Sequence, residues 1–461
     1  MEFNFQKRPI RIYNTLSQSK EIFYPIASPN VSMFVCGPTV YDYSHIGHAK
    51  TYTQFDFIAR YLRLKGFNVY YLQNITNIDD KIISRSNEKG VAWKELTEDF
   101  EEKYLEDMRS LHNFSVTKYA RATDYVPQII CQVRKLMEKG FAYRTEDGIY
   151  FEISKFPEYG KLARRTQTEE SDARSRIDDS REKKGWNDFC LWKFKRENEP
   201  YWESELGQGR PGWHIEDTAI SESHFGEQYD IHGGAVDLIF PHHEAEIAQM
   251  ESISGKSPFV KYWLHTGFLN TKLIKMSKSL GNFLTIREAL TKYNFRILRF
   301  FFLSAHYKKP LELSHKSLEK AKHSLDRIDE YISSIDPNLE DIKFEDIINK
   351  YRNKLYLFLD DDFNTPRAIA TLYDFIRELN TLDGAGHYVH AFFHELNTIF
   401  DFFDLKEKVT DSEILTQIKQ REHYRNNGDF EKADEIRAQL LKLGVQLYDT
   451  KNGAKWRIKS N

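Results

Sequence analysis

The sequence is poor in cysteine and contains no long apolar run. Its 461 residues include three cysteines, Cys36, Cys131 and Cys190, and no two of them form a C-x-x-C pair. Neither a disulfide framework nor a zinc ribbon is therefore expected. No run of about eighteen apolar residues occurs, and the first residues lack the apolar segment of an export signal. We expect a cytoplasmic protein that makes no contact with a membrane.

An excess of charge of one sign is missing as well. Lysine and arginine total 66 residues against 69 aspartates and glutamates, which leaves a net charge of -3 at pH 7. This balance neither indicates nor rules out a nucleic-acid partner, so any RNA-binding surface has to be local. The length predicts roughly three domains at about 150 residues each.

The first third of the chain alternates strand-like and helix-like segments. Residues 31–36 and 68–76 are rich in β-forming side chains, and residues 49–66 between them carry apolar side chains at helical spacing. This βαβ unit predicts a parallel sheet. Ligands of such sheets bind beyond the carboxyl ends of the strands, where Cys36 and His45 would lie.

The middle of the chain interrupts this alternation. Residues 121–223 contain a charge-rich stretch, and we interpret them as an insertion rather than as sheet. The apolar pattern of residues 229–240 predicts that the sheet resumes there, and residues 245–254 predict a helix.

Beyond residue 313 the pattern becomes helical. Apolar residues three and four apart predict a helical bundle, beginning with Leu318, Ala321, Leu325, Ile328 and Ile332. In the last fifty residues, Asp429 is the expected N-cap of a helix that Gly444 ends. The basic residues 451–461 include a tryptophan, and they are compatible with an RNA contact or with a frayed terminus.

Two short motifs carry the chemistry. His45-Ile46-Gly47-His48 lies between the first strand-like and helix-like segments, as a phosphate-binding turn requires, and Lys275-Met276-Ser277-Lys278-Ser279 follows far downstream. Either motif alone is compatible with an ordinary buried histidine or a solvated basic loop. Together they resemble the signature of class I aminoacyl-tRNA synthetases. The resemblance implies that the imidazoles contact the ATP phosphates, that the glycine admits adenine, and that the lysine loop closes over the reacting phosphate.

Further blocks narrow the resemblance to one family. Residues 36–42, 74–81, 212–216, 230–234, 240–246 and 360–366 resemble those of cysteinyl-tRNA synthetases, and the resemblance extends over nearly the full chain. It implies ATP-dependent ligation of L-cysteine to its tRNA through a cysteinyl-adenylate, with Mg²⁺ accompanying ATP, in a monomeric enzyme. A ligase that joins activated cysteine to a small amine, and a non-catalytic tRNA-binding paralogue, are the alternatives.

The family resemblance also implies a zinc site. A metal that binds thiolate separates cysteine from serine better than pocket shape alone, because serine's hydroxyl is a poorer ligand. The implied ligands are Cys36, Asp217, His242 and Glu246, of which Asp217 replaces the family's cysteine; His243 ranks behind His242. We favour a retained but looser zinc site over one that has lost its metal and recognises cysteine by shape and Cys36.

The remaining roles follow from the same resemblance. The catalytic residues would be His45, His48, Lys275 and Lys278, with Lys278 the foremost. Gly47, Gly233 and Gly234 would join His45, His48 and Lys278 in binding ATP. Cysteine would contact Cys36, Thr76, Trp213, His232 and Asp237, although core packing is an equally ordinary role for Trp213.

The expected fold is α/β: a class I synthetase with a Rossmann-like parallel sheet and an insertion, followed by an α-helical bundle and a small C-terminal domain. We expect the catalytic domain in two halves, residues 1–120 and 224–265, separated by an insertion at 121–223. The lysine loop and a stem-contact region follow at 266–313. A tRNA-binding helical bundle is expected at 314–408 and a small anticodon-binding domain at 409–461.

Overall fold

A computed structural model describes most of the chain. The described residues are 8–165, 182–271, 274–275, 284–382, 384–405, 412–442, 445–450 and 453–458. They form two compact units. The first comprises Met1–Ala321, Lys354–Ile369 and Ile399–Asp401, and the second comprises Lys322–Asn353, Ala370–Thr398 and Phe402–Asn461.

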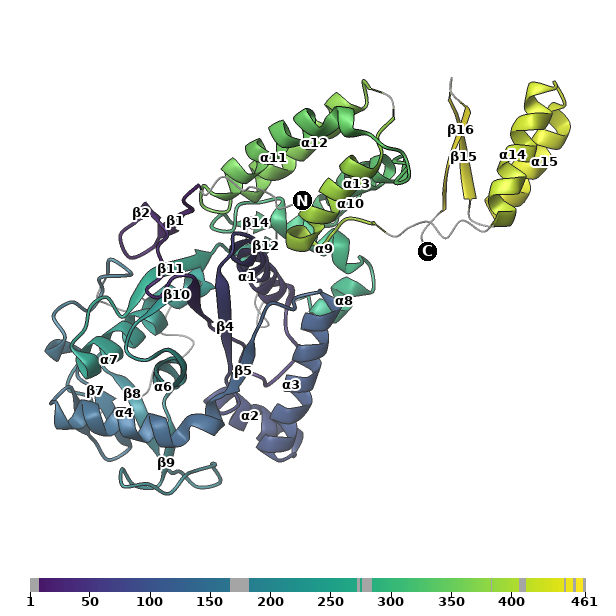
Figure 1. The fold of residues 1–461 in the computed structure, drawn as a ribbon. Coiled ribbons are helices and arrows are strands. Elements are labelled where there is room, and N and C mark those ends of the chain that lie inside the picture. The colour runs from purple at the N-terminus through teal and green to yellow at the C-terminus, as the bar shows by residue number, and fades with distance from the viewer. Residues whose placement is uncertain are drawn as a thin grey trace. The chain divides into compact units, whose positions relative to one another are not determined.

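A parallel five-stranded sheet forms the centre of the first unit (Figure 1). Its strands, in spatial order, are β11 (Val260–Thr266), β10 (Tyr229–Ala235), β3 (Asn30–Val35), β4 (Asn68–Ile75) and β5 (Lys118–Arg121). Strand β3 is the central strand, and its last three residues, Met33, Phe34 and Val35, are apolar and fully buried. Helix α1 (Ile46–Leu64) connects β3 to β4. The predicted βαβ unit is confirmed.

The order of the strands reverses beside β3. Strand β4 lies on one side of β3 and β10 on the other, and both pair with it in parallel. A crevice forms beyond the carboxyl ends of two strands where the winding changes direction in this way. The main-chain N–H of Cys36, just after β3, donates to the carbonyl of Gly233 in β10 at 3.0 Å. This hydrogen bond joins the carboxyl ends of β3 and β10, where ligands of such a sheet are expected to bind.

Helices and small sheets surround the parallel sheet. The helices of the first unit are α2 (Asp80–Lys89), α3 (Trp93–Ser110), α4 (Val126–Glu138), α6 (Trp213–Phe225), α7 (Glu244–Ser254), α8 (Ile286–Leu290) and α9 (Phe295–Leu303). The small sheets are a hairpin of β1 (Arg11–Asn14) and β2 (Ser19–Ile22), and a group of β12 (Leu269–Thr271), β13 (Ile274–Lys275) and β14 (Leu311–Glu312). Among the described helices, none combines the length and apolar character needed to cross a bilayer.

The expectation that residues 121–223 contain no sheet is wrong. They include a four-stranded antiparallel sheet of β6 (Ala142–Arg144), β7 (Gly148–Phe151), β8 (Phe189–Phe194) and β9 (Gly209–Pro211). Its strands are short, but their side chains, such as Ile149, Phe151 and Trp192, are fully buried in the core of the first unit. The high charge of the flanking segments hid these brief apolar runs. Most of the charge-rich stretch itself lies outside the described residues.

The strand predicted over residues 229–240 is shorter than expected. Strand β10 ends at Ala235, and the next residues form two short helical turns, η3 (Val236–Leu238) and η4 (Ile239–His243), before α7 begins. The apolar run continues past the strand because Phe240 packs into the core without extending the sheet.

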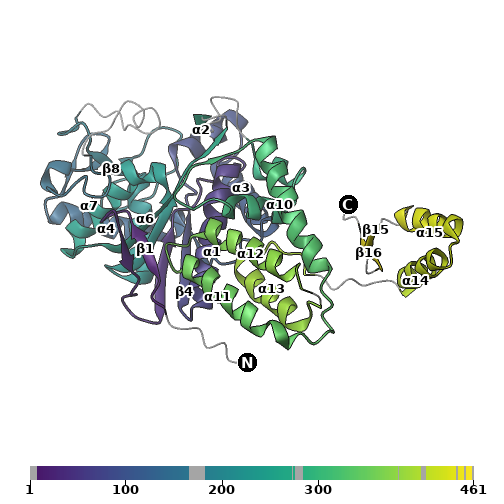
Figure 2. The ribbon, with the colours of Figure 1, turned by 90° about the horizontal axis from the view of Figure 1, so that it is seen from above.

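Helices α10 (His315–Ser333), α11 (Glu345–Leu359), α12 (Thr365–Leu379) and α13 (His387–Phe400) follow. The apolar stripe predicted from Leu318 to Ile332 is buried along α10, so this helix is confirmed. Figure 2 labels these four helices in the view from above. Within the second unit, aromatic contacts join the helices, including Tyr331 with Phe393 and Phe375 with Phe392.

The last part of the second unit has a small core of its own. Helices α14 (Ser412–Asn426) and α15 (Phe430–Lys442) are followed by a hairpin of β15 (Val445–Thr450) and β16 (Gly453–Ile458). Asp429 accepts a hydrogen bond from the N–H of Lys432, which confirms it as the N-cap of α15. Gly444 lies outside the described residues. Because residues 453–458 pair in a hairpin, a wholly frayed terminus is the wrong interpretation of the tail.

Candidate active site

The turn before α1 presents two imidazoles beyond the carboxyl end of β3. His45 is the N-cap of α1, and its Nδ1 accepts a hydrogen bond from the N–H of His48 at 3.2 Å. The two rings stack with their centroids 3.8 Å apart. A Cβ at Gly47 would lie 2.8 Å from His45 Nδ1, so only glycine leaves room for this ring. Since Nδ1 of His45 is an acceptor, a neutral ring carries its proton on Nε2, where it can be donated to an anion.

The segment after the lysine loop is attached to this turn by main-chain pairing. The N–H of Ile46 donates to the carbonyl of Leu284 at 2.9 Å, and the N–H of Ile286 donates to the carbonyl of Ser44 at 3.0 Å. His45 also forms an antiparallel bridge with Thr285. On the other side of the loop, the main chain of Lys275 belongs to β13. Lys278 lies outside the described residues.

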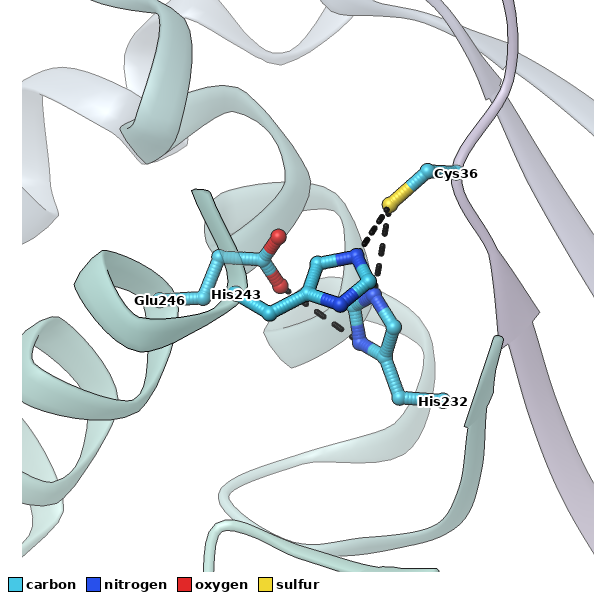
Figure 3. Close-up of side chains that lie close together, drawn as sticks. All are labelled: Cys36, His232, His243 and Glu246. Atoms are coloured by element: carbon cyan, nitrogen blue, oxygen red, sulfur yellow. Dashed lines mark hydrogen bonds and ion pairs between the residues drawn. The ribbon is translucent and has the colours of Figure 1, made fainter. Parts of the chain in front are cut away.

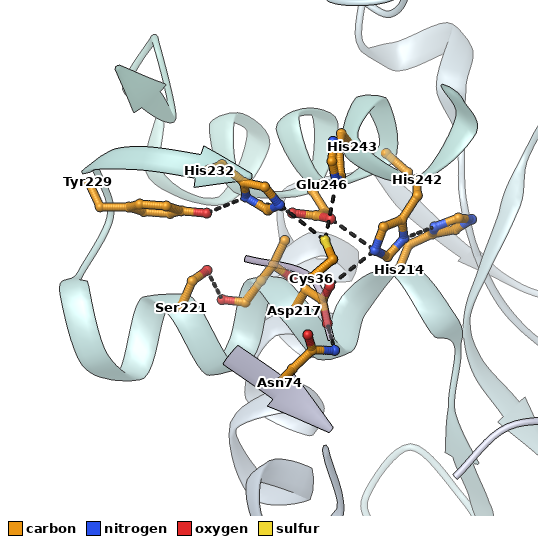
Figure 4. Close-up of polar contacts among 12 residues, drawn as sticks. Cys36, Asn74, His214, Asp217, Ser221, Tyr229, His232, His242, His243 and Glu246 are labelled. Atoms are coloured by element: carbon orange, nitrogen blue, oxygen red, sulfur yellow. Dashed lines mark hydrogen bonds and ion pairs between the residues drawn. The ribbon is translucent and has the colours of Figure 1, made fainter. Parts of the chain in front are cut away.

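A cluster of potential metal ligands lies around Cys36, just after β3 (Figure 4). Cys36, Asp217, His242 and Glu246 are buried, and their ligand atoms lie within 4.8 Å of one another. Nε2 of His242 is 3.1 Å from Oδ2 of Asp217 and 3.1 Å from Oε1 of Glu246. Four separate elements supply these residues: the end of β3, α6, η4 and α7. His242 and Glu246 are four residues apart across the start of α7, and this spacing brings their side chains together.

Two further histidines approach the same cysteine (Figure 3). Nε2 of His232 is 3.3 Å and Nε2 of His243 is 3.1 Å from the sulfur of Cys36. With Cys36 and Glu246 they form a second group whose ligand atoms meet the same 4.8 Å limit. The family resemblance implies that His232 binds cysteine and that His243 ranks behind His242 as a ligand. That both histidines contact Cys36 was not predicted.

Several residues that support the cluster were not predicted. Asn74 donates from Nδ2 to Oδ1 of Asp217 at 2.6 Å. His214 lies 2.9 Å from His242 between their Nδ1 atoms. His265 and Tyr229 similarly approach His243 and His232. Asn74 and His214 lie inside family-like blocks of the sequence, but no spacing pattern indicates that His265 and Tyr229 reach this site.

Burial makes charged forms unfavourable in this cluster. Burial, followed by the charges of Asp217 and Glu246, raises the pKa of the Cys36 thiol well above its usual value. Burial and then Asp217 raise the pKa of Glu246. Burial lowers the pKa values of His232 and His243 and brings that of His265 to about 3. These three imidazoles are therefore neutral at pH 7, the form in which an imidazole binds a metal.

The donor set fits a divalent late metal. It offers a sulfur, imidazole nitrogens and carboxylate oxygens, which are the ligands that zinc prefers. Neither oxygen of Glu246 has a hydrogen-bond partner among the described residues, although both are fully buried. A buried carboxylate without a donor is costly unless a cation compensates its charge.

The other residues predicted to bind cysteine differ in their burial and in their contacts with the cluster. Trp213 begins α6, is partly buried, and stacks on His242 at 4.2 Å with an interplanar angle of 9°. Thr76 is buried, and its hydroxyl oxygen accepts from Asn74 Nδ2 at 3.3 Å. Asp237 is exposed in η3. Trp213 therefore contacts the cluster directly, and none of the interactions described for the cluster involves Asp237.

The glycine pair in β10 brings its backbone close to side chains. A Cβ at Gly233 would lie 2.4 Å from the ring of Phe55, and one at Gly234 would lie 2.9 Å from Cε1 of His243. Larger residues at either position would displace these rings. The predicted approach of adenosine to Gly233 and Gly234 stays a prediction.

Comparisons with known proteins identify the family. Residues 22–323 match a model described as the tRNA synthetases class I (C) catalytic domain, and residues 356–404 match a DALR domain. A cysteine–tRNA ligase of Thermococcus onnurineus (strain NA1) is 43% identical over 472 residues, which cover 97% of this chain and 99% of the relative. One from Geobacter sp. (strain M21) is 43% identical over 481 residues, with coverage of 98% and 100%.

The chain belongs to the cysteine–tRNA ligase family. A crystal structure of Mycobacterium tuberculosis methionyl-tRNA synthetase bound by methionyl-adenylate is similar in fold, with a TM-score of 0.59 at 14% identity. The likeness covers 82% of this chain and 88% of that one. The predicted family, enzyme class and α/β fold class are thereby confirmed.

The acidic block 360–366 of this cysteine–tRNA ligase family member lies at the α11–α12 connection. Within the first unit, Asp362 accepts hydrogen bonds from the N–H of Tyr13 at 2.9 Å and the hydroxyl of Tyr307 at 2.8 Å. Asp360 accepts from the hydroxyl of Tyr61 in α1 at 2.6 Å. These carboxylates therefore attach the connection to β1 and α1, and the structure gives them a structural role.

Proposed function

We propose that this chain activates L-cysteine with ATP, forming cysteinyl-adenylate and pyrophosphate, and then transfers the cysteinyl group to the terminal ribose of the tRNA for cysteine. The main-chain hydrogen bond from Ile46 to Leu284 is the observation that supports this reaction most. It attaches the segment after the lysine motif to the His45 turn, so both motifs meet beyond the carboxyl ends of the strands. The buried group around Cys36 lies at the same end of the sheet, as a cysteine-specific site requires.

The first step needs alignment and charge stabilisation more than proton transfer. The carboxylate of cysteine is already a nucleophile, so it attacks the α-phosphate as pyrophosphate leaves, with no general base. His45 and His48 would donate hydrogen bonds to the phosphates, Gly47 would admit adenine, and Lys275 and Lys278 would stabilise the developing charge. Mg²⁺ would accompany ATP. Thr76, Trp213, His232 and Asp237 would line the cysteine and adenylate pocket.

We propose one zinc ion per chain, held by Cys36, Asp217, His242 and Glu246. When bound, zinc supplies a Lewis acid that ligates a cysteine thiolate directly and gains far less from serine's hydroxyl. Asp217 makes this site harder than one with a second thiolate, so we expect looser binding. Asn74 orients Asp217 through its hydrogen bond to Oδ1.

Metal analysis of protein purified without chelator tests the zinc proposal. We expect stoichiometric zinc after supplementation, tighter binding in Asp217→Cys, and a reduced preference for cysteine over serine in Cys36→Ser. Less than stoichiometric zinc in the supplemented parent, together with an unchanged preference in Cys36→Ser, would contradict the metal and leave the reaction standing.

ATP–pyrophosphate exchange across a panel of amino acids, followed by charging of tRNA, tests the reaction. We expect exchange with cysteine alone, and cysteine-dependent charging of tRNA. Exchange without charging would favour the ligase that acts on a small amine, and no exchange with any amino acid would favour a non-catalytic paralogue. The monomeric state and the cytoplasmic location stay predictions.

A further inference from the structure

Three buried imidazoles present the same ring atom to two carboxylates and one thiol. Nε2 of His242 faces Asp217 and Glu246, whereas Nε2 of His232 and Nε2 of His243 face Cys36 (Figures 3 and 4). One zinc ion takes four ligands, so a single set of four cannot use all of them. The site therefore contains more ligand atoms than one metal position uses.

Together with Cys36 and Glu246, the two remaining histidines form a complete second set of four ligands. Cys36, His232, His243 and Glu246 are all buried, and one ligand atom from each lies within 4.8 Å of the others. The two oxygens of Glu246 lie beside different histidines: Oε1 is 3.1 Å from Nε2 of His242, and Oε2 is 3.4 Å from Nδ1 of His232, the ring nitrogen that points away from Cys36. Glu246 thus borders both sets at once.

The outer contacts of His232 and His243 also match those of metal ligands. Nδ1 of His243 lies 2.8 Å from Nε2 of His265, whose Nδ1 is 2.8 Å from the hydroxyl of Thr15. Nδ1 of His232 lies 2.5 Å from the hydroxyl of Tyr229. A histidine that binds a metal through one nitrogen usually has its other nitrogen fixed by such a contact.

We propose that Cys36, His232, His243 and Glu246 form a second position for a divalent zinc-like ion, alternative to the position at Asp217 and His242. The two positions share Cys36 and Glu246, so the chain holds one ion and not two. This inference adds a position to the metal site proposed above, but it concerns metal binding and holds whether or not the chain charges tRNA.

Net charge explains why this chain can use the second position. The Asp217 position surrounds a divalent ion with three anionic ligands, whereas the second surrounds it with two, which leaves no net charge. An uncompensated charge in a fully buried site is costly. The second position also supplies two imidazoles and one carboxylate in place of one imidazole and two carboxylates, a softer set that suits late divalent metals better.

Substitution of Asp217 separates the two positions. Zinc and Co²⁺ would be titrated into the purified full-length Asp217→Ala chain, with metal content and the cobalt–thiolate absorption as readouts. We expect one ion per chain with the thiolate band retained, and an affinity within about tenfold of the parent. In this background, His243→Ala is expected to weaken binding about 100-fold, a loss typical of a lost ligand or its support. His242→Ala in the same background is the matched control and is expected to leave binding nearly unchanged.

A second measurement does not depend on the double variants folding. X-ray absorption of zinc-loaded Asp217→Ala is expected to show one sulfur and two imidazole ligands. Loss of the ion from a folded Asp217→Ala chain, a single imidazole, or equal effects of His242→Ala and His243→Ala would each overturn the second position. The proposed reaction is judged separately, by cysteine-dependent pyrophosphate exchange of the parent chain.

Discussion

At the scale of single residues, Lys50 is a cation buried without a carboxylate. It follows the His45 turn on α1 and is 1% exposed. Its Nζ donates to the carbonyl of Gly267 at 2.6 Å, with the carbonyl of Tyr307 at 3.4 Å. These two carbonyls belong to the segments that lead into β12 and β14. Lys50 therefore connects α1 to the small sheet of β12, β13 and β14, while burial lowers its pKa to about 7.

This lowered pKa predicts a pH-dependent stability. Between about pH 7 and the ordinary lysine value of 10.5, the folded state binds fewer protons than the unfolded chain. The free energy of unfolding should therefore rise with pH across this window, by up to about 1.4 kcal/mol per unit relative to Lys50→Met. Denaturant unfolding of both chains from pH 7 to 10 measures the difference, and a difference that stays constant with pH would contradict the assignment.

Lys278 carries the foremost catalytic prediction. Its charge would act on phosphate mainly in the transition state, so Lys278→Ala should lower the rate of adenylate formation far more than it weakens cysteine binding. Single-turnover and steady-state pyrophosphate exchange measure the two effects. A loss found wholly in KM, with kcat unchanged, would show that the lysine acts in substrate binding instead.

At the scale of elements, His45 has two separable roles in α1. Its ring caps the helix through the N–H of His48, and it is also the expected phosphate donor. His45→Asn should keep the cap, because asparagine is a good N-cap residue, whereas His45→Ala should lose about 1 kcal/mol of stability. Both variants should slow adenylate formation. Thermal unfolding and pyrophosphate exchange on the same preparations separate these roles, and full activity of His45→Asn would refute the phosphate contact.

Helix α9 is fixed to its neighbours by one buried arginine. Arg299 is fully buried and pairs with Asp56 of α1 at 2.8 Å. It also donates to the carbonyls of Leu111 and Phe400 at 3.2 and 3.1 Å. The planar guanidinium thus joins helix α1 to the residues that end α3 and α13.

Removing this guanidinium should destabilise the first unit strongly. Arg299→Ala leaves a buried carboxylate and several carbonyls with fewer donors, and such losses typically cost about 3–5 kcal/mol. Asp56 keeps its contact with Arg60, so we expect the lower end of that range. Arg134→Ala, which removes an arginine with only exposed partners, is the control and should change the unfolding temperature little. Similar shifts for both variants would refute the role of Arg299.

At the scale of the whole molecule, the C-terminal residues pack around their own small core. Ile418, Leu440, Val445 and Leu447 form this core from α14, α15 and the hairpin. The His45 turn, the lysine motif and the cluster around Cys36 all belong to the first unit. The two activities should therefore be separable.

Removal of residues 411–461 should leave cysteine-dependent pyrophosphate exchange largely intact and impair charging of tRNA. Circular dichroism on the same preparation verifies that the shortened chain is folded. An equal loss of exchange and charging in a folded truncation would show that the C-terminal residues support adenylate formation itself.

The sequence by itself determined the family, the order of the motifs and the main elements. The segments that became β3, α1 and β4 were predictable because local periodicity and the position of the His45 turn agree. The proximity of His242 and Glu246 was predictable because four-residue spacing places both on one helical face. Short, aromatic strands such as β7 and β8 were not predictable, since each is too brief to form a pattern amid charged neighbours.

Only the tertiary structure decided which histidines meet Cys36. His232, His243 and His265 come from β10, η4 and β11, and no spacing in the chain relates them to one another or to β3. Their convergence depends on the parallel pairing of β10 with β3 and β11, which brings the ends of strands distant in sequence to one edge. Local sequence fixes the chemistry of each side chain, but the register of non-local strand pairing decides which of these side chains share a site.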